Sequence, residues 1–172
     1  MTDSPVLPLA RVALRILVVL NWAFGVAILV LLVATIVAEH WTFTALGIRP
    51  DSWIPSMIMG LRAIAVLGLV AIPLNDVVLR RLLAMIDTVQ RGDPFVAANA
   101  ARLQTIAWTL LALQVLSLVI GGVGKVISTP AHPLHLEAGF STSGWLAVLM
   151  TFILARVFAA GAVMRDDLAG TV

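Results

Sequence analysis

The residues best suited to bind a metal are three histidines in the connections between long apolar segments. His40 follows Glu39 directly, and His132 and His135 lie in a later connection, shortly before Glu137. Imidazole and carboxylate groups are ligands that zinc and copper accept in proteins. Prolines within the later connection preclude a simple helical pair of histidines, and nothing in the sequence shows that the two connections meet. We therefore expect no cofactor and favour polar, pH-sensitive loop residues, with a zinc or copper site at the histidines as the alternative.

Polar side chains inside the apolar segments form a second set of candidates. They are Arg62, Asp76, Gln114 and Arg156. A charge at the depth of a bilayer is costly, so such groups usually pair or extend toward the interface. We expect Asp76 to pair with Arg156, and Arg62 to reach outward to Glu39 or Asp51. For Gln114 we expect a hydrogen bond to a neighbouring helix. These roles are structural, and substrate binding is the alternative.

A tight turn between two helices is predicted at residues 92–95. An apolar stripe from Val78 to Val89 indicates that the second apolar segment continues as one amphipathic helix to about residue 91. Gly92 suits the left-handed position that closes a helix. Asp93 and Pro94 suit the N-cap and the first position of the next helix. The sequence therefore predicts a helical hairpin.

This hairpin, residues 80–102, is the largest surface that we expect on the cytoplasmic side. The residues expected to contact a protein partner there are Phe95, Asn99, Arg102, Asp166 and Asp167. The two aspartates lie near the C-terminus, where they would clamp the tail to arginines of the hairpin through charge-assisted hydrogen bonds. The alternatives are a solvated connection without a partner and a tail whose acids face water.

The elements that must position these groups are four apolar segments, at about residues 16–38, 54–79, 103–127 and 143–163. At 1.5 Å per residue, each is long enough to cross a hydrocarbon core of about 30 Å. The chain is 61% hydrophobic and only 12% charged, and its mean hydropathy is +1.07, which excludes an ordinary soluble domain. We predict one membrane domain over residues 1–172, an all-α four-helix bundle running up-down-up-down.

Arginines cluster on one side of the predicted spans. They are Arg11, Arg15, Arg80, Arg81, Arg91, Arg102, Arg156 and Arg165. Only Arg49 and Lys125 flank the other side. Because basic flanking residues stay on the cytoplasmic side, both termini and the hairpin are expected in the cytoplasm. The formal charge of +2 argues against direct nucleic-acid binding, and contact with anionic lipid headgroups explains the arginines.

Two stretches of the chain also match a known pattern in order and spacing. The matching residues are Gly92-Asp93-Pro94-Phe95, then Asn99, Ala101, Arg102 and Leu103, then Ala155-Arg156-Val157-Phe158, Asp166-Asp167-Leu168 and Thr171-Val172. Over essentially its whole length the chain resembles a bacterial family of small four-span membrane proteins of unknown function, often encoded beside a Cro-like helix-turn-helix regulator. The resemblance implies a location in the bacterial inner membrane, a regulatory partner and no catalytic residues.

No run of residues has the spacing of a nucleotide loop, a catalytic triad or a metal hairpin, so we expect no enzyme. The leading hypothesis is a regulatory or sensory membrane component that presents the hairpin and tail to a cytoplasmic protein. The alternatives are an accessory subunit of a larger membrane complex and a small homo-oligomeric transporter or pore. Internal repeats and a helix broken at mid-membrane, which are typical of transporters, are not evident in the sequence.

Overall fold

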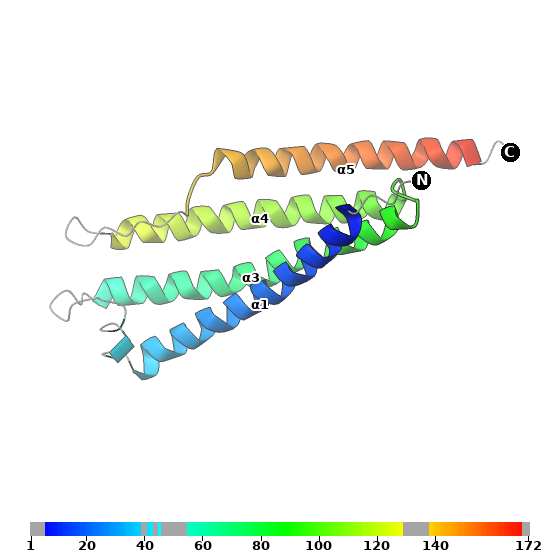
Figure 1. Ribbon diagram of the computed structural model, residues 1–172. Helices are drawn as coiled ribbons and strands as arrows, with labels where there is room; N and C mark the ends of the chain where they lie inside the picture. Colours follow the sequence, from blue (N-terminus) through cyan, green and yellow to red (C-terminus); the bar gives the residue numbers. More distant parts are fainter. Residues whose placement is uncertain (1–5, 39–40, 43–44, 46–54, 129–137, 170–172) are drawn as a thin grey trace. The chain divides into compact units, whose positions relative to one another are not determined.

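The computed structural model of the chain describes residues 6–38, 41–42, 45, 55–128 and 138–169. These residues form the long helices α1 (Val6–Val37), α3 (Pro55–Gln90), α4 (Ala97–Ile127) and α5 (Thr142–Ala169) (Figure 1). Each contains a stretch that is long and apolar enough to cross a membrane, and these stretches are Leu7–Val37, Met57–Gln90, Ala97–Ile127 and Thr142–Arg165. The prediction of an all-helical chain with four such helices is confirmed.

In the turn between α3 and α4, Gly92 has the predicted left-handed conformation, whereas Asp93 and Pro94 do not have their predicted roles. Gly92 has a φ of 80°, and its N–H donates to the Val89 carbonyl at 3.0 Å. The N–H of Asp93 donates to the Thr88 carbonyl at 3.1 Å. These two bonds form the Schellman motif, in which a left-handed residue, usually glycine, ends a helix.

The predicted start of α4 is wrong by three residues. Asp93 belongs to the end of α3, because its amide closes the Schellman motif. It is therefore not the N-cap of α4, and Pro94 is not its first residue. The chain needs residues 93–96 to reverse direction, so α4 begins at Ala97. The prediction that α3 continues past the apolar segment is confirmed, since α3 is one helix to Gln90 with Pro73 inside it.

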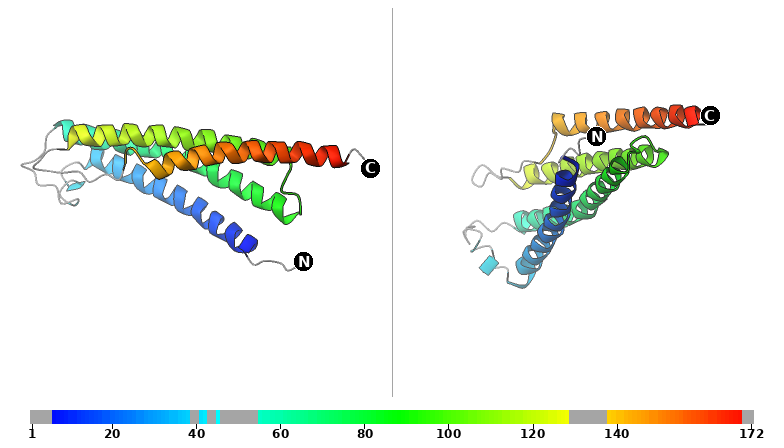
Figure 2. Two further views of the ribbon diagram at one scale, coloured as in Figure 1. Left: turned by 90° about the horizontal axis from the view of Figure 1, so that it is seen from above. Right: turned by 45° about the vertical axis from the view of Figure 1, so that its right-hand side comes forward.

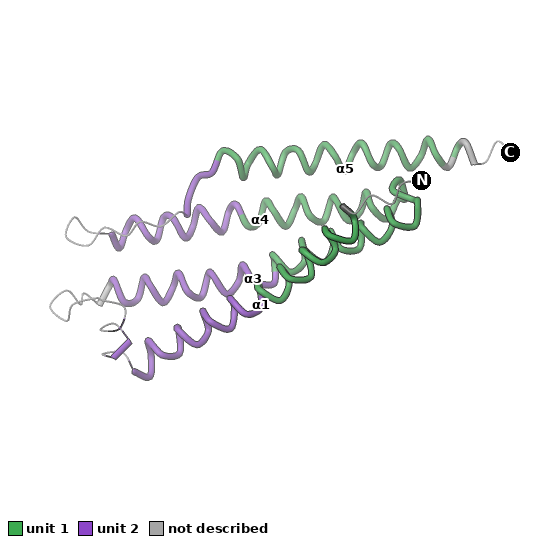
Figure 3. The backbone as a smooth tube through the Cα atoms, viewed as in Figure 1, with its two compact units in different colours: residues 1–21, 74–113, 142–172 green, residues 22–73, 114–141 purple. Residues whose placement is uncertain are grey.

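Two compact units divide the described helices (Figure 3). Unit 1 comprises residues 1–21, 74–113 and 142–172, and unit 2 comprises residues 22–73 and 114–141. Helices α1, α3 and α4 each contribute one part to each unit, whereas α5 belongs to unit 1. The contacts below are given unit by unit.

Unit 1 contains the hairpin and α5, which Figure 2 shows from two further directions. Its core is formed by small and branched apolar side chains that are at most 7% exposed, namely Leu103, Ile106, Ala107, Val148, Ala155 and Ala162. The T-shaped pair Trp108–Phe152, with ring centroids 5.3 Å apart, joins α4 to α5. Alanines allow the two helix backbones to approach each other closely.

In unit 2, the segment that leads into α5 is seated on α4. The Ser117 hydroxyl accepts a hydrogen bond from the Gly139 N–H at 3.2 Å and lies 3.3 Å from the Gly139 carbonyl oxygen, to which it donates. One turn further along α4, a Cβ atom at Gly121 would lie 2.6 Å from the Ala138 carbonyl oxygen. The chain can therefore lie this close to α4 only because residue 121 has no side chain.

Candidate functional site

The hairpin between α3 and α4 is built around one buried amide. Asn99 has no exposed surface. Its Nδ2 donates to the Thr88 hydroxyl at 2.7 Å and to the Pro94 carbonyl at 2.9 Å, and its Oδ1 accepts from Nη1 of Arg102 at 2.8 Å. Both N–H groups and the carbonyl of the amide are thus paired, which is what makes a buried asparagine tolerable.

The partners of Asn99 extend this network into α3. The Thr88 hydroxyl donates to the Met85 carbonyl at 2.7 Å, and Nη1 of Arg102 donates to the Ala84 carbonyl at 3.2 Å. The network therefore ties the start of α4 to the last turns of α3. Asn99 and Arg102 were expected to touch a partner; because Asn99 is fully covered, its contribution to a partner surface could only be indirect, through the shape of the hairpin.

Two contacts attach α5 to the turn. The Phe95 and Phe158 rings lie with their centroids 5.3 Å apart, and Arg165 forms an ion pair with Asp93 at 2.6 Å. Phe95 still exposes 42% of its surface, and its role as a partner contact stays a prediction.

An ion pair joins α5 to the turn, but its residues differ from those of the predicted clamp between the tail and the hairpin. Here an arginine of α5 meets an acid of the turn, Arg165 with Asp93, whereas the sequence suggested acids of the tail meeting arginines of the hairpin. Asp167 is exposed, and the side chain of Asp166 lies outside the described part of the structure. The roles expected for these two aspartates stay predictions.

The start of α1 is joined to the same hairpin by an ion pair between Arg11 and Asp87, which are about one-third and one-half exposed. Next to it, Nε of Arg91 donates to the backbone carbonyl of Asp87 at 3.0 Å. Helices α1, α4 and α5 therefore all contact the last turns of α3 or the turn that follows it, within unit 1.

Among the polar residues inside the apolar helices, Asp76 has a partner other than the one predicted. Asp76 pairs with Arg80, one turn along α3, at 2.6 Å and not with Arg156. This correction follows from geometry, because residues four apart on a helix already face each other. In unit 2, Arg62 donates to the Thr35 carbonyl of α1, and its predicted acidic partners, Glu39 and Asp51, lie outside the described residues.

Gln114 also departs from the expectation of an interhelical hydrogen bond. Its Oε1 is buried and accepts no hydrogen bond from any described residue. An amide oxygen in this position is costly in an apolar environment unless a molecule other than the chain supplies a donor. Among the described residues, no interhelical hydrogen bond to this oxygen supports the expected role of Gln114.

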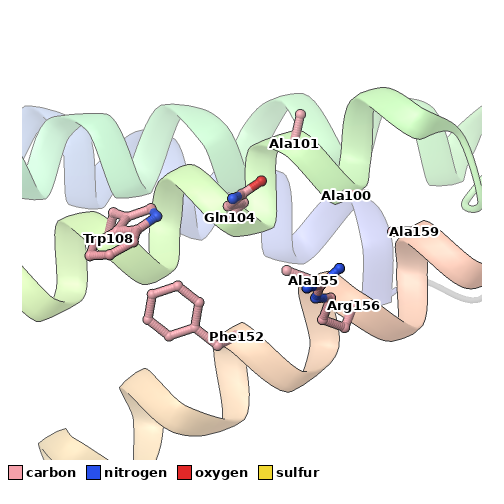
Figure 4. A pocket seen from close by; sticks show the side chains of 8 residues that line it. All are labelled: Ala100, Ala101, Gln104, Trp108, Phe152, Ala155, Arg156 and Ala159. Carbon is pink, nitrogen blue, oxygen red and sulfur yellow. The ribbon is translucent and has the colours of Figure 1, made fainter.

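A cavity of about 400 Å³ opens between α4 and α5 in unit 1 (Figure 4). Trp108 and Phe152 lie at one end, and the guanidinium of Arg156 lies toward the other. The small side chains of Ala155 and Ala159, one turn apart on α5, line it and leave the space open. In this cavity a charged group, an amide and aromatic rings surround one hollow.

The proposed metal ligands cannot be placed. His40, His132 and His135 all lie outside the described residues. Within residues 6–38, 55–128 and 138–169, no group of three or more histidine, aspartate or glutamate side chains is arranged to hold a metal ion. The zinc or copper alternative therefore stays a prediction about the connections.

Sequence reasoning missed the ion pair of Asp93 with Arg165 and the cavity beside Arg156. Asp93 was interpreted as a helix cap and Arg165 only as an indicator of orientation, although an acid in the turn and a base near the end of α5 were both visible. No protein-family model, curated protein or solved structure matches the chain. The contacts described above therefore carry the functional argument.

Proposed function

We propose that the chain is a multi-pass protein of the bacterial inner membrane. Its four helices run up-down-up-down, with both termini and the α3–α4 turn in the cytoplasm. The apolar stretches in all four helices support insertion, and the clustering of arginines near one set of helix ends supports this orientation. The opposite order of the paired residues on α3 and α4, Thr88 with Asn99 and Ala84 with Arg102, agrees with an antiparallel arrangement.

Cysteine labelling tests the orientation, because the chain has no cysteine of its own. Gln90→Cys at the end of α3 and Lys125→Cys near the far end of α4 are both exposed positions. A membrane-impermeant maleimide is expected to label Lys125→Cys in cells whose inner membrane is intact, and Gln90→Cys only after that membrane is permeabilised. Equal labelling of the two positions, or the reverse order, would contradict the proposed topology.

Within that membrane, the protein acts as a non-enzymatic regulatory or sensory component whose hairpin binds a cytoplasmic protein. The observation that carries this proposal is the fully paired buried network of Asn99, because a satisfied polar network fixes one shape of the turn. Around that fixed core the hairpin exposes Val89, Phe95 and Arg91. A surface with two apolar side chains and a cation suits a partner with an apolar patch rimmed by acids.

Purification in mild detergent with tagged protein tests the proposal. Phe95→Ala and Arg91→Glu should each reduce recovery of a soluble cytoplasmic protein by at least about tenfold, the effect of losing about 1.4 kcal/mol of binding. Lys125→Glu is the matched control, with the same charge reversal at an exposed site near the other end of α4. Equal recovery with all three variants would refute the hairpin as the binding surface.

A second candidate, an accessory subunit of a larger membrane complex, is favoured by α1. Only 6% of its most apolar stretch is buried, and large side chains such as Val19 and Phe24 are mostly exposed. Lipid covers such a helix adequately, and so does another membrane protein. Recovery of a stoichiometric set of integral membrane proteins, in place of a soluble partner, would favour this candidate.

A further inference from the structure

We infer that the cavity between α4 and α5 binds the phosphate group of an anionic phospholipid through Arg156, with the lipid chain lying against the alanines and aromatic rings. The inference rests on the membrane location proposed above. It adds to that proposal a ligand class and a site within unit 1, and it does not depend on a protein partner at the hairpin.

The two walls of the cavity run in opposite directions. From the turn into α4 the contacts run from Phe95 to Trp108, and along α5 their partners run backward from Phe158 to Phe152. One turn from Trp108 toward the hairpin therefore corresponds to one turn from Phe152 toward the end of α5. Gln104 and Arg156 occupy these positions, and both line the cavity. The hollow thus has a polar end toward the hairpin and an aromatic end away from it (Figure 4).

The polar end holds a positive charge that no described residue neutralises. Among the described residues, Arg156 takes part in no ion pair or hydrogen bond, and a guanidinium remains charged at any physiological pH. Three carboxylates of unit 1 face other arginines, in the pairs Asp76–Arg80, Asp87–Arg11 and Asp93–Arg165. An anion from outside the chain is a partner of suitable charge for Arg156.

The side chains that line the cavity suit a ligand with a phosphate group and an apolar chain. A guanidinium binds phosphate oxygens through two parallel hydrogen bonds. The side-chain amide of Gln104 can donate a further hydrogen bond. The cavity volume of about 400 Å³ lies in the usual range for small-ligand sites, about 300–1,000 Å³. Its remaining walls are alanines and aromatic rings, which an acyl chain contacts more favourably than a soluble anion would.

Position along the helix also favours a lipid over a soluble phosphate. Arg156 lies about 14 Å from Arg165 along α5 at 1.5 Å per residue, so its long side chain can reach toward the headgroup layer. The neighbouring outward positions Leu154 and Val157 are apolar and about half exposed. Basic pockets between membrane helices near the cytoplasmic face are typical sites for anionic lipid headgroups.

Native mass spectrometry and thermal melting of the full chain test this site. The probes are phosphatidylglycerol, phosphatidylcholine and free glycerol phosphate, each added to protein in mild detergent. We expect phosphatidylglycerol to be retained and to raise the melting temperature. Arg156→Gln should weaken its binding by at least about tenfold, as loss of a charge-assisted hydrogen bond does. Arg81→Gln is the matched control, because it removes an exposed arginine of the same unit outside the cavity.

A second variant keeps the charge and removes the space. Ala159→Leu places a larger apolar side chain in the cavity, and it should weaken phosphatidylglycerol binding while Arg156 remains. Equal losses from Arg156→Gln and Arg81→Gln would overturn the site in favour of general surface attraction. Equal binding of phosphatidylcholine would overturn the role of charge, and equal stabilisation by glycerol phosphate would identify a soluble ligand in place of a lipid. These failures leave the maleimide result intact, so they are distinguishable from failure of the proposed membrane topology.

Discussion

Asn99→Leu is expected to lower the free energy of unfolding by about 1–3 kcal/mol, the cost of leaving buried polar groups unpaired. Leucine has the same number and branching of side-chain heavy atoms, so the loss arises from hydrogen bonding and not from a cavity. The variant removes the donors to the Thr88 hydroxyl and the Pro94 carbonyl and the acceptor for Arg102. Thr88 is buried in the folded hairpin, and Pro94 and Arg102 are half-buried, so these groups cannot all turn to water.

The measurement is unfolding in detergent, combined with hydrogen exchange at the amides of Gly92 and Asp93. Both amides are bonded in the turn, so their exchange should accelerate when the network is lost. Gln90→Leu is the control, since it makes the same amide-to-leucine change at an exposed position near the turn. If the two variants unfold alike, Asn99 does not hold the hairpin together.

Alanine substitutions at Gly121 and Gly122 are expected to have opposite effects. At Gly121 the new Cβ would lie 2.6 Å from the Ala138 carbonyl oxygen and 2.7 Å from the Gly139 Cα atom. Backbone atoms cannot swing aside as a side chain does, so the helix and the segment must separate, at a cost of about 1–3 kcal/mol. At Gly122 no atom lies within 4 Å of the new Cβ, and alanine favours the helix by up to about 1 kcal/mol.

The two variants are compared by melting temperature and by hydrogen exchange at the Gly139 amide, which donates to Ser117. Exchange should accelerate in Gly121→Ala and stay unchanged in Gly122→Ala. Shifts of the same sign and size in both variants would show that Ala138 and Gly139 are not seated on α4 as described.

Features governed by neighbouring residues were predictable from the sequence. Long apolar runs define the four helices, and a glycine after an amphipathic stripe indicated the end of α3 at Gln90 and the left-handed Gly92. The i, i+4 pair of Asp76 with Arg80 was equally local, and it was missed because membrane depth was given more weight than helical spacing.

Features that depend on the register between helices were not predictable. An aspartate after glycine fits either the end of one helix or the start of the next. In the structure Asp93 closes the end of α3, and its carboxylate forms an ion pair with Arg165 on α5. The cavity exists because Trp108 meets Phe152, which brings Gln104 and Arg156 to the same level. Composition and spacing within one helix contain no information about that alignment.

The ion pair between Arg11 and Asp87 has a consequence for biogenesis. Its partners are 76 positions apart in the chain, and ribosomes add about 5–20 residues per second. The carboxylate therefore emerges about 4–15 s after the guanidinium that it binds. In the proposed membrane arrangement, the translocon and lipid alone retain α1 during this interval, which its long apolar stretch permits, and docking onto α3 comes as a later step.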